Sequence, residues 1–270
     1  PVFSIERRWR PNYSNIVNSL FFADSEKSNH SLPLSLPSSS VLLCLPCLTT
    51  SSSRPPRDCF LVSVPVRILS RSTCLFPFRI LTRIADIIEQ NLDEFAKAES
   101  IDSGKPFAMA RSVDIPRAHQ NIRFFATSLL HFSSESHSMP NEAINYTLRQ
   151  PIGVVGCISP WNLPLYLFTW KIAPALATGN CVIGKPSEMT PMTAYLLSKA
   201  CIEAGLPEGV LNIVHGHGAK TGQAMVEHPH IKAISFTGGT ETGKKIISTA
   251  GPMFKKLSLE LGGKNPNVIF

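Results

Sequence analysis

The sequence lacks a long uninterrupted hydrophobic run. Its most apolar stretch, residues 41–48, contains Pro46 and is far shorter than the roughly 18 to 20 residues that a membrane-spanning helix needs. Cysteines are few and irregularly spaced, since there are seven in total and four of them fall within residues 1–79. An odd, uneven set argues against a disulfide framework and favours a reducing compartment. We therefore expect no membrane span and a cytoplasmic protein.

Acidic residues are scarce in the first part of the chain. Residues 1–79 contain 9 Lys and Arg against 4 Asp and Glu; subtracting these from the totals of 26 and 19 leaves 17 against 15 for residues 80–270. The basic excess thus lies in the part with the least regular pattern. A nucleic-acid partner needs a basic surface on a folded element, so the sequence predicts no such partner.

Residues 1–79 also lack a regular hydrophobic period. They contain 16 Ser and 9 Pro, and runs such as "SLPLSLPSSSVLLCLPCLTTSSSRPPR" follow neither the helical nor the strand pattern. We expect a disordered segment outside the folded domain. Its composition is typical of an organellar transit peptide, which would make the protein mitochondrial, but a gene-model artefact joined to a real domain is an equal alternative. Cys44 and Cys47 form an isolated C-x-x-C, for which we predict no metal site.

From residue 80 onward the patterns are regular. Apolar residues recur every three or four positions in "RILTRIADIIEQNLDEFAKAESIDSG", which predicts one amphipathic helix, and a second helix is predicted over residues 115–130. Beyond Pro151, the β-rich runs "GVVGCIS", "CVIGKP", "LNIVHG" and "IKAISFTG" alternate with helical stretches that begin near Pro164, Thr190, Ala219 and Thr240. This alternation predicts an α/β fold with a parallel sheet. Thr190 is expected to be a helix N-cap, and Gly205 to follow that helix.

Four polar loops follow the predicted strands. They read "SPWN" at residues 159–162, "KPSE" at 185–188, "GHGAKTG" at 216–222 and "FTGG" at 236–239. Ligands of parallel sheets bind at the carboxyl ends of the strands. The "FTGG" loop opens a helix whose N–H groups suit a pyrophosphate, whereas the glycine loop departs by one residue from the dinucleotide fingerprint. Lys185 and Glu188 suit ribose hydroxyls, and the carboxylate would repel a 2′-phosphate, which indicates NAD rather than NADP.

One glutamate interrupts an apolar run near the end of the sequence. Glu260 lies between Leu259 and Leu261 and precedes two glycines. A carboxylate buried there must be paired, protonated or used in proton transfer, because an unpaired buried charge is costly. The residues alone leave open whether Glu260 is a paired core carboxylate or a general base.

The motifs "PWN", "KPSE", "G-x-G", "FTG" and "LELGGK", in this order, closely resemble the NAD-dependent aldehyde dehydrogenase family from about residue 80 to the end. The runs "IPRAHQNIRFFA" and "ISPWNLPLYL" are similar to its aminomuconic and hydroxymuconic semialdehyde dehydrogenase branch. The resemblance implies a Rossmann-like doubly wound sheet, homo-oligomers, and oxidation of an aldehyde or semialdehyde to a carboxylic acid with NAD.

That family carries its nucleophilic cysteine a few dozen residues beyond the glutamate of "LELGG". We therefore expect an incomplete catalytic domain here, with Cys157, Cys181 and Cys201 as core residues. A catalytically inactive protein that binds NAD or another subunit is the alternative.

The resemblance also implies roles for individual residues. Glu260 would be the general base, with a pKa raised by partial burial. Asn162 would donate to the oxyanion, an effect worth about 3 to 4 kcal/mol for a comparable donor; apart from the resemblance, it is a helix N-cap. Leu167 and Trp170 would line the substrate tunnel or pack in the core, and Arg117 would anchor a substrate carboxylate or be an ordinary surface residue.

The implied NAD-binding set lies mostly in the four loops. It comprises Ile158, Ser159, Pro160, Trp161, Lys185, Ser187, Glu188, Gly218, Gly222, Phe236, Thr237, Gly238, Gly239 and Leu261. At Gly239 the family often has a serine whose hydroxyl binds phosphate, so the glycine here leaves only its backbone N–H.

Overall fold

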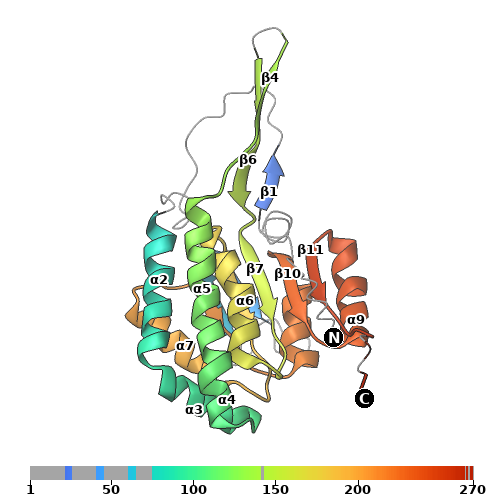
Figure 1. Ribbon diagram of the computed structural model, residues 1–270. Helices are drawn as coiled ribbons and strands as arrows, with labels where there is room; N and C mark the ends of the chain where they lie inside the picture. Colours follow the sequence, from blue (N-terminus) through green and yellow to red (C-terminus); the bar gives the residue numbers. More distant parts are fainter. Residues whose placement is uncertain are drawn as a thin grey trace.

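A computed structural model describes residues 22–25, 41–45, 60–64, 75–140, 143–264, 266, 268 and 269 of the chain. At its centre is a five-stranded sheet with the strand order β11-β10-β7-β8-β9, of which Figure 1 labels β7, β10 and β11. Every neighbouring pair is parallel. The strands are β7 (Val154–Ile158), β8 (Cys181–Lys185), β9 (Leu211–Ile213), β10 (Ile231–Thr237) and β11 (Lys256–Glu260).

The strand order reverses beside β7. Strands β8 and β9 follow on one side of β7, whereas β10 and β11 lie on the other. All residues of β7 and β8 are buried, which is typical of a parallel sheet covered on both faces. The doubly wound sheet predicted from the sequence is thus confirmed. Its switch point between β7 and β10 is where ligands of such sheets bind.

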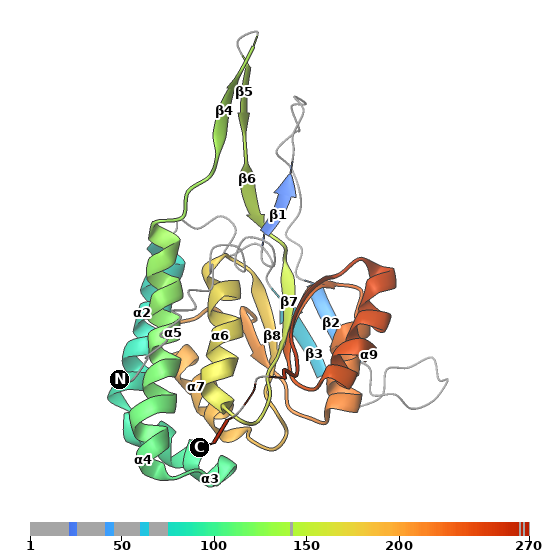
Figure 2. The ribbon, with the colours of Figure 1, turned by 45° about the vertical axis from the view of Figure 1, so that its right-hand side comes forward.

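Helices cover both faces of the sheet (Figure 2). One face carries α2 (Leu75–Gln90), α3 (Leu92–Ser103), α5 (Ile115–Leu130), α6 (Pro164–Ala177) and α7 (Met192–Glu203), and the other carries α8 (Gln223–Glu227) and α9 (Thr240–Ala250). A short helix α4 (Phe107–Met109) and a π-helix η1 (Ala110–Asp114) join α3 to α5. A second π-helix, η2 (Gly218–Gly222), precedes α8, and a 3₁₀ turn, η3 (Gly251–Met253), follows α9.

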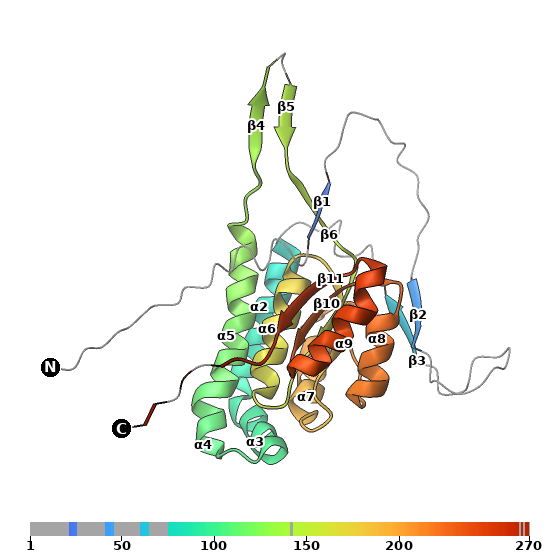
Figure 3. The same ribbon diagram turned by 90° about the vertical axis from the view of Figure 1, so that its right-hand side faces the viewer.

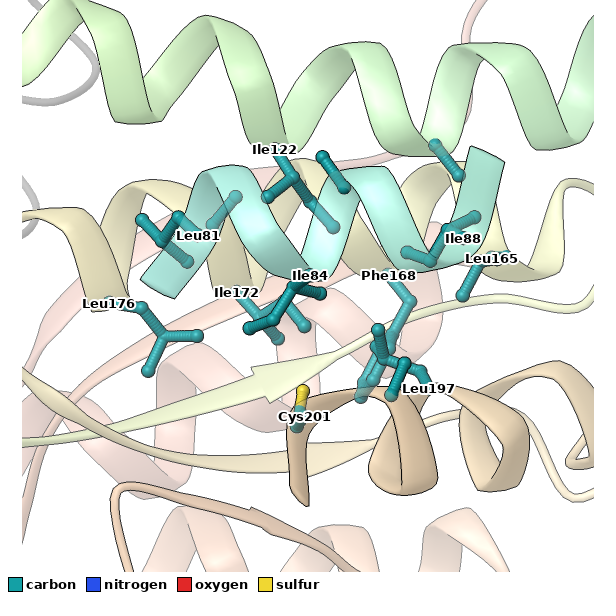
Figure 4. Packing of buried hydrophobic residues seen from close by; sticks show 14 of the residues in the cluster. Leu81, Ile84, Ile88, Ile122, Leu165, Phe168, Ile172, Leu176, Leu197 and Cys201 are labelled. Atoms are coloured by element: carbon teal, nitrogen blue, oxygen red, sulfur yellow. The ribbon is translucent and has the colours of Figure 1, made fainter. Parts of the chain in front are cut away.

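The larger hydrophobic core lies under the first set of helices (Figure 4). Phe168 of α6 is fully buried there, together with Ile84 of α2 and Leu197 of α7. Gly184 of β8 leaves the space that the Phe168 ring fills, because a Cβ atom at Gly184 would lie 2.5 Å from Cζ of Phe168. This packing holds α6 against the sheet and so fixes the loop that precedes α6.

Two helix predictions need correction. The single helix predicted from residue 80 is broken at Asn91 into α2 and α3; the Asn91 side chain donates a 2.8 Å hydrogen bond to the carbonyl of Ile87, a local bond that competes with the helix. Thr190 is not an N-cap, since its buried hydroxyl has no hydrogen-bond partner among the described residues. Asp102 instead accepts from the Met192 amide at 2.7 Å. Gly205 follows α7 with a positive φ of 81°, as predicted.

A hairpin projects from the body of the protein (Figure 3). It consists of the antiparallel strands β4 (Ser136–Met139) and β5 (Ala143–Tyr146). Strand β6 (Leu148–Pro151) continues from it toward the sheet and pairs with β1 (Phe22–Ser25). Among the described helices, none combines the length and apolar character needed to cross a bilayer.

The expectation of an irregular segment over residues 1–79 is not met at three places. Besides β1, strands β2 (Val41–Leu45) and β3 (Phe60–Val64) form an antiparallel pair, and α2 begins at Leu75. Both strands of the pair are short apolar runs, which suit strand pairing more than the surrounding Ser- and Pro-rich sequence does. The domain boundary at residue 80 stays a prediction.

Candidate cofactor site and active site

The loops after β7 and β10 flank the switch point of the sheet. Residues 159–162 follow β7, where the amide of Ser159 donates to the carbonyl of Lys185 at 3.1 Å. The hydroxyl of Ser159 is buried without a hydrogen-bond partner in the described part of the chain. Ile158 is buried, Pro160 is half-buried, and Trp161 is 61% exposed. An unpaired buried hydroxyl beside exposed apolar surface is suited to contact a bound molecule.

Lys185 and Glu188 form an ion pair at the end of β8. The Lys185 ammonium lies 3.1 Å from Oε2 of Glu188 and donates to the carbonyl of Pro186 at 3.0 Å. Lys185 is 2% exposed, whereas Glu188 is 36% exposed. A hydrogen bond from its own backbone amide is the main cause that holds the pKa of Glu188 below its ordinary value. Desolvation opposes it, and the hydrogen bond and charge of Lys185 add to the lowering. Glu188 therefore offers a fixed, ionised acceptor to solvent, as a ribose hydroxyl requires.

The glycine loop lies next to this pair. A Cβ atom at Gly222 would approach Cδ of Lys185 at 3.9 Å, whereas Gly218 faces open space. His217 places its Nδ1 3.8 Å from Oε1 of Glu188. Ser187 is buried and accepts from the amide of Met189 at 3.2 Å, which shapes the loop rather than presenting the hydroxyl to a ligand. The structure thus brings together three of the predicted cofactor residues and turns Ser187 inward.

The "FTGG" loop joins β10 to α9. Phe236 is buried, Thr237 and Gly238 are half-buried, and Gly239 is exposed as the N-cap residue of α9. No side-chain cap closes this helix end, so its first N–H groups are available to an anion. Leu261 packs on α9, where a Cβ atom at Gly243 would lie 2.5 Å from the Leu261 side chain. The predicted cofactor residues of the "FTGG" loop and Leu261 thus lie around the N-terminus of α9.

Glu260 is the last residue of β11 and lies opposite Thr237 of β10. Its carbonyl accepts the amide of Gly238 at 3.1 Å, so the predicted base is tied to the "FTGG" loop. The side chain is exposed, which corrects the expectation of a partly buried carboxylate. The prediction treated the flanking leucines as a buried run, but β11 is an edge strand of the described sheet, where the side chain of Glu260 is exposed.

Asn162 is exposed and does not cap α6. The N-cap position is Leu163, and the Asn162 side chain makes no hydrogen bond within the described residues. The prediction of Asn162 as the N-cap is therefore wrong by one residue, because α6 begins at Pro164 and Leu163 takes the N-cap position. Its carbonyl accepts from Lys105 at 3.4 Å. The amide is therefore free to donate to a ligand.

Lys171 is a residue of this region that the sequence analysis missed. It is 5% exposed on α6 and donates to the hydroxyl of Ser235 on β10 at 3.4 Å. Burial lowers the pKa of Lys171 from 10.5 to about 8, opposed by Cys157 and by Glu260. In the apolar sequence of α6, only its charge distinguishes Lys171 from the core residues around it, and the sequence does not show that this charge is buried near Glu260. A cation with that pKa near Glu260 is suited to proton transfer at neutral pH.

Helices α5 and α6 run side by side in the same direction. Asn121 of α5 donates to the carbonyl of Tyr166 at 3.2 Å, and Phe125 packs edge-on against Trp170 with ring centroids 5.6 Å apart. Both pairs are offset by 45 positions in the chain. Arg117, one turn before Asn121, therefore lies at the level of the loop that contains Asn162.

The predicted substrate residues occupy different positions on this helix pair. Arg117 is exposed, whereas Leu167 is half-buried. Trp170 is half-buried and packs against the core, so it is held in place by packing. Its role in substrate binding stays a prediction.

Cys157, Cys181 and Cys201 are free thiols, and all three are buried. Burial raises the pKa of Cys157 and of Cys201 to about 12, and that of Cys181 to about 11. A thiol is nucleophilic only as its thiolate, so these residues are suited to the core. Among the described residues, no cluster of three or more His, Cys, Asp or Glu side chains is placed to hold a metal ion; Cys47 lies outside them.

Comparison with known proteins gives a consistent result. A 2-aminomuconic semialdehyde dehydrogenase of Homo sapiens is 57% identical over 193 residues, which are 71% of this chain and 40% of that protein. A 2-hydroxymuconic semialdehyde dehydrogenase of a Pseudomonas species is 48% identical over 196 residues, again 71% of this chain and 40% of that protein. The chain thus spans about 40% of the length of the curated relatives it matches.

The fold comparison agrees with the sequence comparison. The NAD+ complex of an aldehyde dehydrogenase from Bacillus cereus superposes with a TM-score of 0.73 at 39% identity, covering 75% of this chain and 41% of that one. The sequence model described as "Aldehyde dehydrogenase family" matches residues 78–270, well over half of the chain. The resemblance stated from the motifs is confirmed, and the chain belongs to the aldehyde dehydrogenase family.

Proposed function

We propose that this protein binds NAD and takes part in oxidising a carboxylate-bearing semialdehyde to the corresponding acid. The observation that carries the proposal is the Lys185–Glu188 pair, whose atoms lie 3.1 Å apart at the end of β8. The pair shares the carboxyl edge of the sheet with the uncapped N-terminus of α9. A ribose acceptor and a phosphate site at one edge fit a dinucleotide.

The residues present fit NAD in two ways. Glu188 is exposed and ionised, which suits a ribose diol and disfavours the extra phosphate of NADP. Gly239 has no side chain to cap α9, so the first backbone N–H groups of that helix are left without a side-chain acceptor. When bound, NAD accepts the hydride that the substrate loses.

The proposed roles of the active-site residues follow from their positions. The exposed amide of Asn162 donates to the oxygen that becomes negative during attack on the aldehyde. Glu260 takes a proton from the hydrolytic water, and the exposed carboxylate is within reach of solvent for this step. Burial lowers the pKa of Lys171 and the nearby Glu260 opposes this effect, so Lys171 places a positive charge near the proposed base.

Arg117 supports the choice of a substrate with a carboxylate. Its helix register places it at the level of the Asn162 loop, it is exposed, and within the described residues it forms no ion pair. An unpaired arginine near the reacting aldehyde suits bidentate binding of a second, acidic group. The relatives named as muconic semialdehyde dehydrogenases agree with this class. Homo-oligomers remain part of the proposal.

Binding of NAD without catalysis is the second candidate function. The burial of Cys157, Cys181 and Cys201 favours it, because the reaction needs an accessible thiolate. Incubating the protein with NAD and a semialdehyde that carries a carboxylate separates the two. Formation of NADH and acid supports the dehydrogenase, binding of NAD without NADH supports the second candidate, and absence of NAD binding contradicts both.

A further inference from the structure

A buried cluster of three charged residues lies beneath the Asn162 loop. Glu99 of α3 is 0% exposed, Asp114 of η1 is 1% exposed, and Lys105, between α3 and α4, is 12% exposed. The Lys105 ammonium lies 2.5 Å from Oδ2 of Asp114 and 3.7 Å from Oε1 of Glu99. One cation thus serves two buried carboxyl groups.

The cluster reaches the loop and helix that hold the predicted oxyanion donor. Lys105 donates to the carbonyl of Asn162 at 3.4 Å, and the amide of Leu165 donates to Oε2 of Glu99 at 3.4 Å. The N-cap residue of α6 supplies no side-chain acceptor for the free N–H groups at the start of that helix. Glu99, which lies on α3, accepts from one of these N–H groups instead. Helices α3 and α4 lie at the end of the molecule where α6 begins (Figure 2).

Two buried carboxyl oxygens in the cluster are left over. Oε1 of Glu99 and Oδ1 of Asp114 have no hydrogen-bond partner in the described part of the chain. Two ionised carboxylates with one ammonium would leave an excess buried negative charge, which is costly. Protonation of one of the two carboxyl groups removes the excess negative charge, so that Lys105 then faces a single carboxylate.

The surroundings indicate that Glu99 takes this proton. Desolvation raises the pKa of Glu99 to about 7, opposed by Lys105 and by the Leu165 amide and reinforced by Asp114. From α7, the uncharged side chain of Thr193 also faces the carboxyl group. When Glu99 is protonated, Asp114 alone neutralises Lys105; when it ionises, the ammonium is drawn toward both carboxylates and its 3.4 Å contact with Asn162 changes.

We propose that Glu99 and Lys105 are positioning residues for Asn162, so that the orientation of the Asn162 amide follows the charge of this buried cluster. The inference rests on the proposed function for the role of Asn162 as an oxyanion donor. The contacts themselves do not depend on it. The cluster would then set how many molecules are ready for catalysis as the pH crosses neutrality.

The test is an NMR titration of the full chain between about pH 5.5 and 8.5, a range that brackets the pKa of about 7. The resonances followed are the side-chain amide of Asn162, the indole of the neighbouring Trp161 and the carboxyl carbon of Glu99. All three are expected to shift with one common midpoint. In Glu99→Gln the midpoint should disappear from Asn162 and Trp161. Glu94→Gln, an exposed glutamate on the same helix, is the matched control and should titrate as the wild type.

Two results would overturn the proposal. One is a Glu99 carbon that titrates while the Asn162 amide does not follow, which the wild type alone reveals even if Glu99→Gln fails to fold. The other is an Asn162 midpoint that persists in folded Glu99→Gln. NAD binding measured on the same samples separates the two proposals. If the protein does not bind NAD but the three resonances share one midpoint, only the proposed function is contradicted. If the protein binds NAD but the resonances share no midpoint, only this inference is contradicted.

Discussion

The backbone amide of Gly238 donates a 3.1 Å hydrogen bond to the carbonyl of Glu260. This bond joins the loop proposed to hold the NAD phosphates to the residue proposed as the general base. The two strands that end in these residues are parallel neighbours, with Thr237 opposite Glu260. A change in the loop therefore affects the cofactor and the base together.

Gly238→Ala tests this link. The new Cβ atom would lie 2.5 Å from Cζ of Phe236 and 3.1 Å from Cε2 of the same ring, so the loop or the ring must move. We expect the Kd for NAD to rise about tenfold, a loss of about 1.4 kcal/mol, as measured by calorimetry. Gly251→Ala, where a Cβ atom meets nothing within 4 Å, is the control. Equal affinities of the two variants would refute the proposed role of the loop.

Gly239→Ser is expected to strengthen NAD binding. Gly239 has a φ of −68° and a ψ of 145°, and a Cβ atom there meets open space, so serine fits without strain. A hydroxyl that binds phosphate should lower the Kd about threefold to tenfold, as one net hydrogen bond allows. Gly239→Ala supplies the carbon without the hydroxyl for comparison. An equal gain in both variants would show that the hydroxyl is not the cause.

Gly184→Ala is expected to destabilise the fold. Its Cβ atom would lie 2.5 Å from Cζ of the fully buried Phe168, and the ring has no free space to enter. Overpacking of this kind costs about 1 to 3 kcal/mol, which urea unfolding measures. An unfolding free energy equal to that of Gly251→Ala would contradict the tight packing of α6 on β8.

Lys171→Met is expected to stabilise the protein in a pH-dependent way. The folded pKa of Lys171 is about 8, below 10.5, so the folded state binds fewer protons between these values. The buried ammonium is destabilising below pH 8, and this effect is relieved as the pH rises toward 10.5. The free energy of unfolding of the variant should exceed that of the wild type by up to about 3 kcal/mol at neutral pH, reduced by the loss of the hydrogen bond to Ser235. This gain should become smaller at higher pH.

Thermal unfolding at several pH values measures this difference. Lys245→Met, on the exposed face of α9, is the control for replacing a lysine by methionine at the surface. A stability difference between Lys171→Met and wild type that does not vary with pH would mean that Lys171 keeps its ordinary pKa in the fold.

The sheet and its loops were predictable because they depend on local signals. The alternation of apolar strands with helices and the motifs from residues 159 to 239 placed the carboxyl edge correctly. The capping of α7 and α6 was not predictable, since the acceptors are Asp102 and Glu99. Both lie on a helix far away in the sequence. Contacts between residues so far apart in the sequence do not appear in the hydrophobic periodicity of either segment.

The exposure of Glu260 shows the same limit. Its flanking leucines read as a buried strand, but the position of β11 at the sheet edge leaves the side chain open. Lys171 shows the opposite case, because a charged residue on a helix is buried by the sheet beneath it. Burial of a charge depends on strand order, which composition and period do not reveal.

The most direct test of the proposed function is a calorimetric titration of the chain with NAD and, separately, with NADP. The Lys185–Glu188 pair predicts that NAD binds and that NADP binds at least about tenfold more weakly, a difference of about 1.4 kcal/mol. Glu188→Gln should weaken NAD binding and narrow that gap. Absence of NAD binding, or equal binding of the two dinucleotides by the wild type, would contradict the assignment of this edge of the sheet as an NAD site.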